Sequence, residues 1–196
     1  MLKDKLKDHT IILASGSPRR QQYFKELELD FKIVLKPVEE LFPKHLKEEE
    51  ITNYLALLKA SPFKNSLLEN DILITSDTIV WHNNEQLGKP KNEVEAIAML
   101  QKLSNSWHRV ITSVCFTTLS TQKTVHHTTK VKFKALQLDE ITHYVTTYKP
   151  LDKAGAYGIQ EWIGLIAIEE IIGSYPNVVG LPTHLVYKTL VSIVNT

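Results

Sequence analysis

The chain has 196 residues, of which 43% are hydrophobic and 23% charged, and its formal net charge is +1. This composition is typical of a globular protein, and the near-neutral charge argues against a nucleic-acid partner or an acidic membrane surface. The single cysteine, Cys115, excludes an internal disulfide, and the sequence contains neither a signal-like segment nor an apolar run of membrane length, which favours a cytoplasmic protein without a membrane partner.

Apolar runs and helix-start signals predict alternating strands and helices. In chain order we expect a strand over 9–15, a helix over 18–29, a strand over 31–36, a helix over 48–63 and a strand over 71–81. A hairpin tip follows at 82–86, then a helix over 93–104, a hairpin of strands over 108–120 and 123–136, a helix over 139–148, a strand over 163–172 and a helix over 182–194. Early alternation followed by hairpins favours an α/β fold with a mixed sheet.

The stretch IILASGSPRRQQ near the N-terminus ends a strand-like run in a hydroxyl-rich turn. Ser17 before a proline is a strong helix start. Arg19 and Arg20, two of only three arginines in the chain, then lie in the first helical turn, where the helix dipole disfavours cations. With the hydroxyl groups of Ser15 and Ser17 they indicate a phosphate site, although neither a Walker nor a dinucleotide pattern occurs. The alternative is a solvated basic turn that pairs with acids such as Glu26.

Asp77 interrupts the apolar run ILITSDTIVW, where simple solvation is a poor explanation. A carboxylate in such a place can hold a magnesium ion that also binds phosphates, or it can orient a water. Three lysines in LLKASP, GKP and DKAGAYG are each explained singly by a structural role, but together they could surround a polyphosphate: Lys59, Lys89 and Lys153. Glu39 or Glu40 could supply a further carboxylate.

The motifs LASGSPRRQ, ALLKA, SDTIV, GKP, WHRVITSV, DKAGAYGIQ and GSYPNVVGLP follow one another along almost the whole chain. In this order they resemble the Maf-like nucleotide pyrophosphatases, first named as septum-formation inhibitors. The resemblance implies one Maf-like domain over 1–196, an elongated α/β fold with a mixed, curved sheet and flanking helices, and two lobes around a central cleft, similar to inosine-triphosphate pyrophosphatases. It also implies hydrolysis of a nucleoside triphosphate to the monophosphate and pyrophosphate, with Mg²⁺ or Mn²⁺ as the divalent metal.

The resemblance implies residue roles by position. Asp77 matches the family's catalytic acid, which serves as proton acceptor, and Lys59 and Lys89 are the other residues expected to be catalytic. Glu40 matches a metal-side carboxylate, so Asp77 and Glu40 are the expected metal ligands. The residues expected to bind substrate are Ser15, Ser17, Arg19, Arg20, Thr78, Lys153 and Gln160.

Substrate choice is also implied by the resemblance. Arg19, Thr78 and Gln160 match the branch that acts on dTTP and UTP, whereas the branch that prefers 7-methyl-GTP carries other residues there. Two departures stand out, WHNNEQ at the second hairpin and Glu161-Trp162 after the glutamine, and the Trp162 ring could narrow the base site. Modified pyrimidine nucleotides, 7-methyl-GTP-type specificity and a regulator of septum formation with weak hydrolysis are the alternatives, and a homodimer is expected because family members are often dimers.

Overall fold

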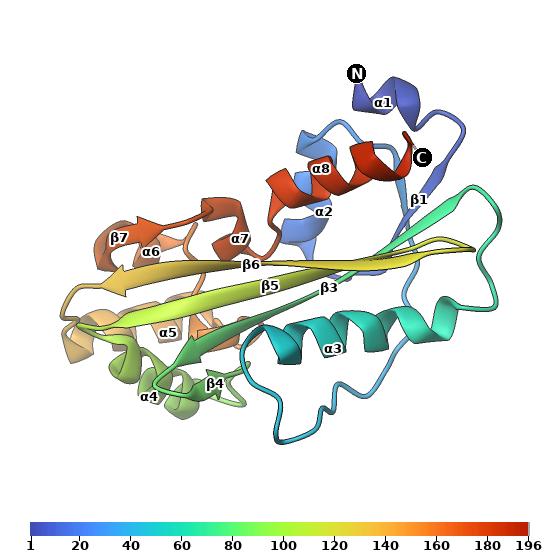
Figure 1. Ribbon diagram of the computed structural model, residues 1–196. Coiled ribbons are helices and arrows are strands. Elements are labelled where there is room, and N and C mark those ends of the chain that lie inside the picture. The colour runs from blue at the N-terminus through green and yellow to red at the C-terminus, as the bar shows by residue number, and fades with distance from the viewer. Residues whose placement is uncertain (196) are drawn as a thin grey trace. The chain divides into compact units, whose positions relative to one another are not determined.

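The computed structural model describes residues 1–195, in which seven strands form one mixed sheet (Figure 1). The strands are β1 (Thr10–Leu13), β2 (Phe31–Ile33), β3 (Asp71–His82), β4 (Glu85–Leu87), β5 (Trp107–Thr117), β6 (Gln122–Phe133) and β7 (Ile168–Ile172). Their order is β2-β1-β3-β5-β6-β7, with β4 paired to β3. β1 is parallel to β2 and β3, whereas β4 and β7 are antiparallel to β3 and β6. The predicted α/β fold with a mixed sheet is confirmed.

The helices follow the sequence signals at most positions. They are α1 (Leu2–Lys5), α2 (Pro18–Glu26), α3 (Glu49–Ala60), α4 (Glu93–Leu103), α5 (Leu138–Tyr148), α6 (Trp162–Ala167), α7 (Tyr175–Val179) and α8 (Thr183–Ile193), with 3₁₀ turns at Ser61–Phe63 and Ala154–Ala156. The short helices α1 and α7 were not expected from the sequence. Among residues 1–195, no helix combines the length and the apolar character that a membrane crossing requires.

Contacts divide the chain into two compact units, and the first comprises Met1–Asp77, Thr112–His127 and the chain from Gly180 onward. Within this unit the first half of β3 is covered on both faces. Ile72 and Ile74 belong to a core formed with α2 and α8, whereas Leu73 packs in a separate cluster with residues of α3. Figure 1 shows α3 along one side of this strand and α2 and α8 on the other. This double cover explains the uninterrupted apolar run before Asp77.

The second unit comprises Thr78–Ile111 and Thr128–Val179 and has its own core. Residues of α4, α5 and α6 share this core with β6: Leu100, Leu103, Phe133, Tyr144 and Ile163. Asn83 and Asn84 form the turn between β3 and β4 with φ values of 47° and 61°, which suits a two-residue hairpin turn. The hairpin expected at 82–86 is therefore confirmed. One domain with a cleft between two lobes stays a prediction.

The strand expected over 163–172 is wrong in its first half. Residues Trp162–Ala167 form α6, and only Ile168–Ile172 form β7. Ile163 and Ala167 are fully buried whereas Leu165 is 83% exposed, a four-residue spacing that fits a helix. A short apolar run does not reveal its period in sequence, because a buried helix and a buried strand both appear continuous.

Candidate active site

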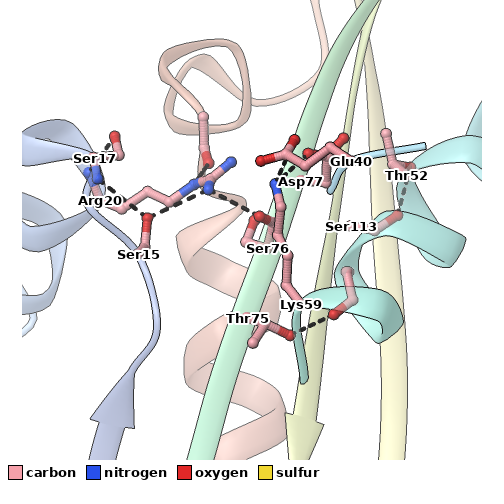
Figure 2. A network of polar contacts seen from close by, with 12 residues as sticks. Ser15, Ser17, Arg20, Glu40, Thr52, Lys59, Thr75, Ser76, Asp77 and Ser113 are labelled. Carbon is pink, nitrogen blue, oxygen red and sulfur yellow. Dashed lines mark hydrogen bonds and ion pairs between the residues drawn. The ribbon is translucent and has the colours of Figure 1, made fainter. Parts of the chain in front are cut away.

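The turn after β1 is organised by its own hydroxyl groups (Figure 2). Ser15 is only 6% exposed, and its Oγ accepts the backbone N–H of Ser17 at 3.3 Å. Ser17 caps α2, because its Oγ accepts the backbone N–H of Arg20 at 3.5 Å and Pro18 occupies the first helical position. The predicted helix start is confirmed, and the first turn of α2 contains basic residues and no acid.

Arg20 holds several parts of the first unit together. Its Nε donates to the carbonyl of Gly180 at 2.9 Å, and its Nη1 donates to the carbonyl of Ser76 at 2.9 Å and to Oγ of Ser15 at 3.4 Å. Burial lowers the pKa of Arg20, and the nearby carboxylate of Asp77 opposes this shift. The guanidinium group therefore supports the backbone beside Asp77, while Glu26, its alternative partner in the sequence interpretation, accepts a bond from Gln22 at 3.0 Å.

Asp77, Lys59 and Glu40 form a compact charged group, seen in Figure 2. The Lys59 Nζ lies 2.7 Å from Oδ1 of Asp77 and 3.0 Å from Oε2 of Glu40. The side chain of Asp77 is 9% exposed and that of Lys59 18%, whereas that of Glu40 is 50% exposed. Burial raises the pKa of Asp77, and the Lys59 ammonium group lowers it in opposition. The result is a shielded carboxylate with one close cation, which suits a general base.

Two hydroxyl contacts fix α3 against the sheet and so place Lys59 beside Asp77. The Thr75 Oγ1 donates to the carbonyl of Ala56 at 2.6 Å, one turn before Lys59. The Thr52 Oγ1 shares a hydrogen bond of 2.6 Å with Oγ of Ser113 on β5. Both threonines are fully buried, so these contacts are protected from water.

The carboxylates of Asp77 and Glu40 are oxygen donors of the type that magnesium and manganese ions prefer. Both contact the same ammonium group, so a single small cation can be reached from both. Within residues 1–195, no cluster of three or more histidine, cysteine, aspartate or glutamate side chains could enclose a metal. The donor set therefore suits an ion whose remaining ligands are phosphate oxygens and water, as magnesium in nucleotide-processing enzymes commonly requires.

The remaining expected substrate residues lie in the second unit, apart from Arg19, which is half-buried on α2. Thr78 is half-buried, and Lys89 and Gln160 are exposed. Lys153 is only 9% exposed, and its Nζ contacts Asp152 at 2.7 Å and Glu161 at 3.1 Å. The segments that carry Lys89 and Lys153 are joined by a hydrogen bond of 3.1 Å from the Gly155 N–H to the Gly88 carbonyl. Convergence of these residues with Asp77 on one polyphosphate stays a prediction.

Sequence reasoning missed three contributors to these surroundings. The carbonyls of Ser76 and Gly180 hold Arg20, and a backbone carbonyl leaves no signal in a sequence. Tyr144 contacts Glu161, and its only signal was its place on the apolar face of α5 beside Ile141.

A surface cavity of about 630 Å³ lies elsewhere in the second unit. It is lined by residues from the end of β3, the β3–β4 turn, β5, β6 and β7, including Trp81, Trp107, Arg109 and Lys130. None of the expected catalytic or substrate-binding residues lines it. The candidate active site is therefore defined by the charged group of Asp77, Lys59 and Glu40, and this cavity is not part of it.

Comparison with known proteins agrees with the motifs. The chain is 59% identical over 194 residues to a protein of Flavobacterium johnsoniae named dTTP/UTP pyrophosphatase, covering 99% of this chain and 100% of the relative. It is 58% identical over 196 residues to one of the same name from Christiangramia forsetii, with complete coverage of both. Among solved structures, the Ham1 protein of Staphylococcus aureus matches with a TM-score of 0.47 and 19% identity, over 63% of this chain and 71% of that one.

The family comparison covers the strands and helices that carry Asp77, Lys59 and Arg20. The model for the family described as Maf-like protein matches residues 10–193. That range includes the whole chain of motifs from the turn after β1 to the start of α8. The protein belongs to the Maf family.

Proposed function

We propose that the protein is a pyrophosphatase that hydrolyses dTTP and UTP to the nucleoside monophosphate and pyrophosphate. The observation that carries this proposal is the Asp77–Lys59–Glu40 group, which lies beside Arg20 in a chain 59% identical to a dTTP/UTP pyrophosphatase. A shielded carboxylate with cations close by is the arrangement that water attack on a phosphate anhydride needs. Clearance of the nucleotide pool in the cytoplasm is the cellular role consistent with this reaction.

Asp77 acts as the general base in this proposal. It accepts a proton from the water that attacks the α-phosphorus, and pyrophosphate departs. Burial raises the pKa of Asp77, which makes the carboxylate a stronger base than an ordinary aspartate, and the Lys59 ammonium group favours its ionised form. The combination of burial and one close cation therefore suits a carboxylate that accepts a proton from water.

Cations of the chain offset the charge of the triphosphate. Arg20 and the N-terminus of α2 provide donors for phosphate oxygens. The hydrogen bonds from Arg20 to the carbonyls of Gly180 and Ser76 hold its guanidinium group in place. Lys89 and Lys153 would stabilise the charge that develops on the departing pyrophosphate. Asp77 and Glu40 would hold a divalent ion, which supplies further neutralisation of the phosphate charge.

Base selection rests on Arg19, Thr78 and Gln160. The Gln160 amide can donate and accept hydrogen bonds at once, which matches the edge of uracil or thymine. A wrong base would leave polar groups of such a site unpaired, so a large preference is attainable. Gln160 is exposed in the second unit and therefore available to a ligand.

The proposal is tested by product analysis with UTP, dTTP and Mg²⁺. We expect monophosphate and pyrophosphate from the wild type, and a loss of at least about a hundredfold in kcat for Asp77→Asn because the base is removed. Asp30→Asn, at an exposed position, is the matched control and should retain full activity. Orthophosphate as the product, equal activity of Asp77→Asn, or UTP binding without turnover would each contradict the proposal.

A further inference from the structure

The carboxylate of Glu161 contacts the segment from Lys153 to Gln160, which directly precedes it in the chain. Two residues with proposed substrate roles, Lys153 and Gln160, lie on this segment. Oε1 of Glu161 lies 3.1 Å from Nζ of Lys153, at the start of the segment. Because Glu161 directly follows Gln160, this contact brings the two ends of the segment together. Residues 155 to 159, between these ends, are all buried.

The other oxygen of Glu161 is held by Tyr144 of α5. The Tyr144 hydroxyl donates to Oε2 of Glu161 at 2.5 Å and accepts the backbone N–H of Gly158 at 3.0 Å. Burial raises the pKa of Tyr144, and the hydrogen bond to Glu161 raises it further, so the hydroxyl keeps its proton at neutral pH. One tyrosine thus links the carboxylate to the middle of the segment.

Gly158 shows how closely the carboxylate packs. A Cβ added at Gly158 would lie 2.9 Å from Cδ of Glu161 and 3.0 Å from its Oε2. Glu161 therefore lies against the backbone of the segment two residues before Gln160, and no side chain separates them. A change in the position of this carboxylate would be transmitted directly to the backbone that carries Gln160.

Independent contacts hold the rest of the segment. The Tyr157 hydroxyl lies 2.7 Å from Nε2 of His108, and both side chains are buried. The Gly155 N–H donates to the carbonyl of Gly88. Because these contacts do not involve Glu161, its replacement should leave the segment folded while loosening Lys153 and Gln160.

We propose that Glu161 is a positioning residue for substrate recognition. Its carboxylate fixes Lys153 for the triphosphate, and through Tyr144 and Gly158 it fixes the backbone that presents Gln160 to the base. This inference rests on the proposed function, since it takes the roles of Lys153 and Gln160 from there. Glu161 itself contacts protein groups and acts through these two residues.

The experiment compares variants by binding and by turnover. Affinities for the α,β-methylene analogues of UTP and CTP, which resist cleavage at the α-phosphorus, are measured by calorimetry, and kcat and KM are measured with UTP and CTP. The variants are Glu161→Ala, Glu161→Gln, Tyr144→Phe and Gln160→Ala, with Glu169→Gln on β7 as the exposed control. Thermal unfolding of each variant reports its stability separately.

For Glu161→Ala we expect an affinity for the UTP analogue about tenfold lower, and a preference for uracil over cytosine reduced toward that of Gln160→Ala. Tyr144→Phe should reduce the preference with a smaller loss of affinity, because the contact of Glu161 with Lys153 remains. Glu161→Gln should keep the preference, since its amide oxygen can still accept from Tyr144, but should raise KM because Lys153 loses a carboxylate partner.

Three outcomes separate the inference from the proposed function. Unchanged preference and KM in Glu161→Ala, with only a lower unfolding temperature, would overturn the inference while hydrolysis by the wild type stands. Preferences that depend on Glu161 in a protein that binds the analogues but does not hydrolyse UTP would contradict the proposed function alone. A wild type that neither binds the analogues nor hydrolyses UTP would overturn both.

Discussion

Burial and one ammonium group act in opposite directions on Asp77. Burial raises the pKa of the carboxyl group, and Lys59, at 2.7 Å, is the largest influence that lowers it. A group whose pKa is raised on folding favours the folded state most at acid pH, and that contribution is lost as the pH rises through the folded-state value. Lys59 limits this loss, because its ammonium group favours the ionised carboxylate in the folded state.

Replacement of Lys59 by methionine isolates the charge effect. In the metal-free protein, Lys59→Met should raise the pKa of Asp77 further, because the desolvation remains and the stabilising cation is gone. The measurement is a titration of the Asp77 carboxyl carbon by ¹³C NMR. Lys64→Met, at an exposed position after α3, is the control and should leave the titration unchanged. A lower pKa of Asp77 in Lys59→Met would contradict the electrostatic description.

Replacement of Arg19 and replacement of Arg20 should have different effects on catalysis and stability. Arg20→Ala should weaken kcat/KM for all substrates alike and lower the free energy of unfolding by about 1–3 kcal/mol, since the carbonyls of Ser76 and Gly180 lose their donor. Arg19→Ala should change the ranking of UTP, dTTP and CTP. Kinetics with the three nucleotides and urea unfolding check both. A changed ranking in Arg20→Ala with unchanged stability would contradict this division.

At the scale of elements, the position of α3 decides where Lys59 lies. Thr75 is fully buried, and its hydroxyl bonds the carbonyl of Ala56 within α3. Thr75→Val keeps the shape but removes this bond, so we expect a loss of about 1 kcal/mol in the free energy of unfolding and a kcat several-fold lower.

Thr142→Val is the matched control for this change. Thr142 is exposed on α5, and its hydroxyl donates to a carbonyl of its own helix, at Leu138. Urea unfolding and steady-state kinetics should therefore show little change in this variant. Full activity of Thr75→Val would mean that the hydroxyl contact is not needed to place Lys59.

Elements with strong local signals were predicted well. The Ser17-Pro18 helix start correctly predicted α2, and the apolar run ILIT correctly predicted β3. The strand predicted over 163–172 was wrong in its first half, where α6 lies. This helix has only six residues, and its helical spacing becomes visible only once the burial of Ile163 and Ala167 is known. Short helices depend on tertiary packing more than on their own sequence.

At the scale of the whole molecule, the site residues come from distant parts of the chain. Family motifs indicated Asp77, Lys59 and Arg20 by position, and the structure adds their contacts within the first unit. Motifs could not reveal that the Arg20 donors bond backbone carbonyls or that Glu161 joins Lys153 to Tyr144. Such contacts depend on how separate elements meet, and spacing along one sequence does not encode them directly.

Hydrolysis of UTP in ¹⁸O-labelled water tests the central claim, that water attacks the α-phosphorus, most directly. Mass spectrometry of the products locates the oxygen that the attacking water supplies. If Asp77 activates a water for attack at the α-phosphorus, one label should appear in UMP and the pyrophosphate should be unlabelled. Label in pyrophosphate with unlabelled UMP, or labelled orthophosphate formed together with UDP, would contradict it.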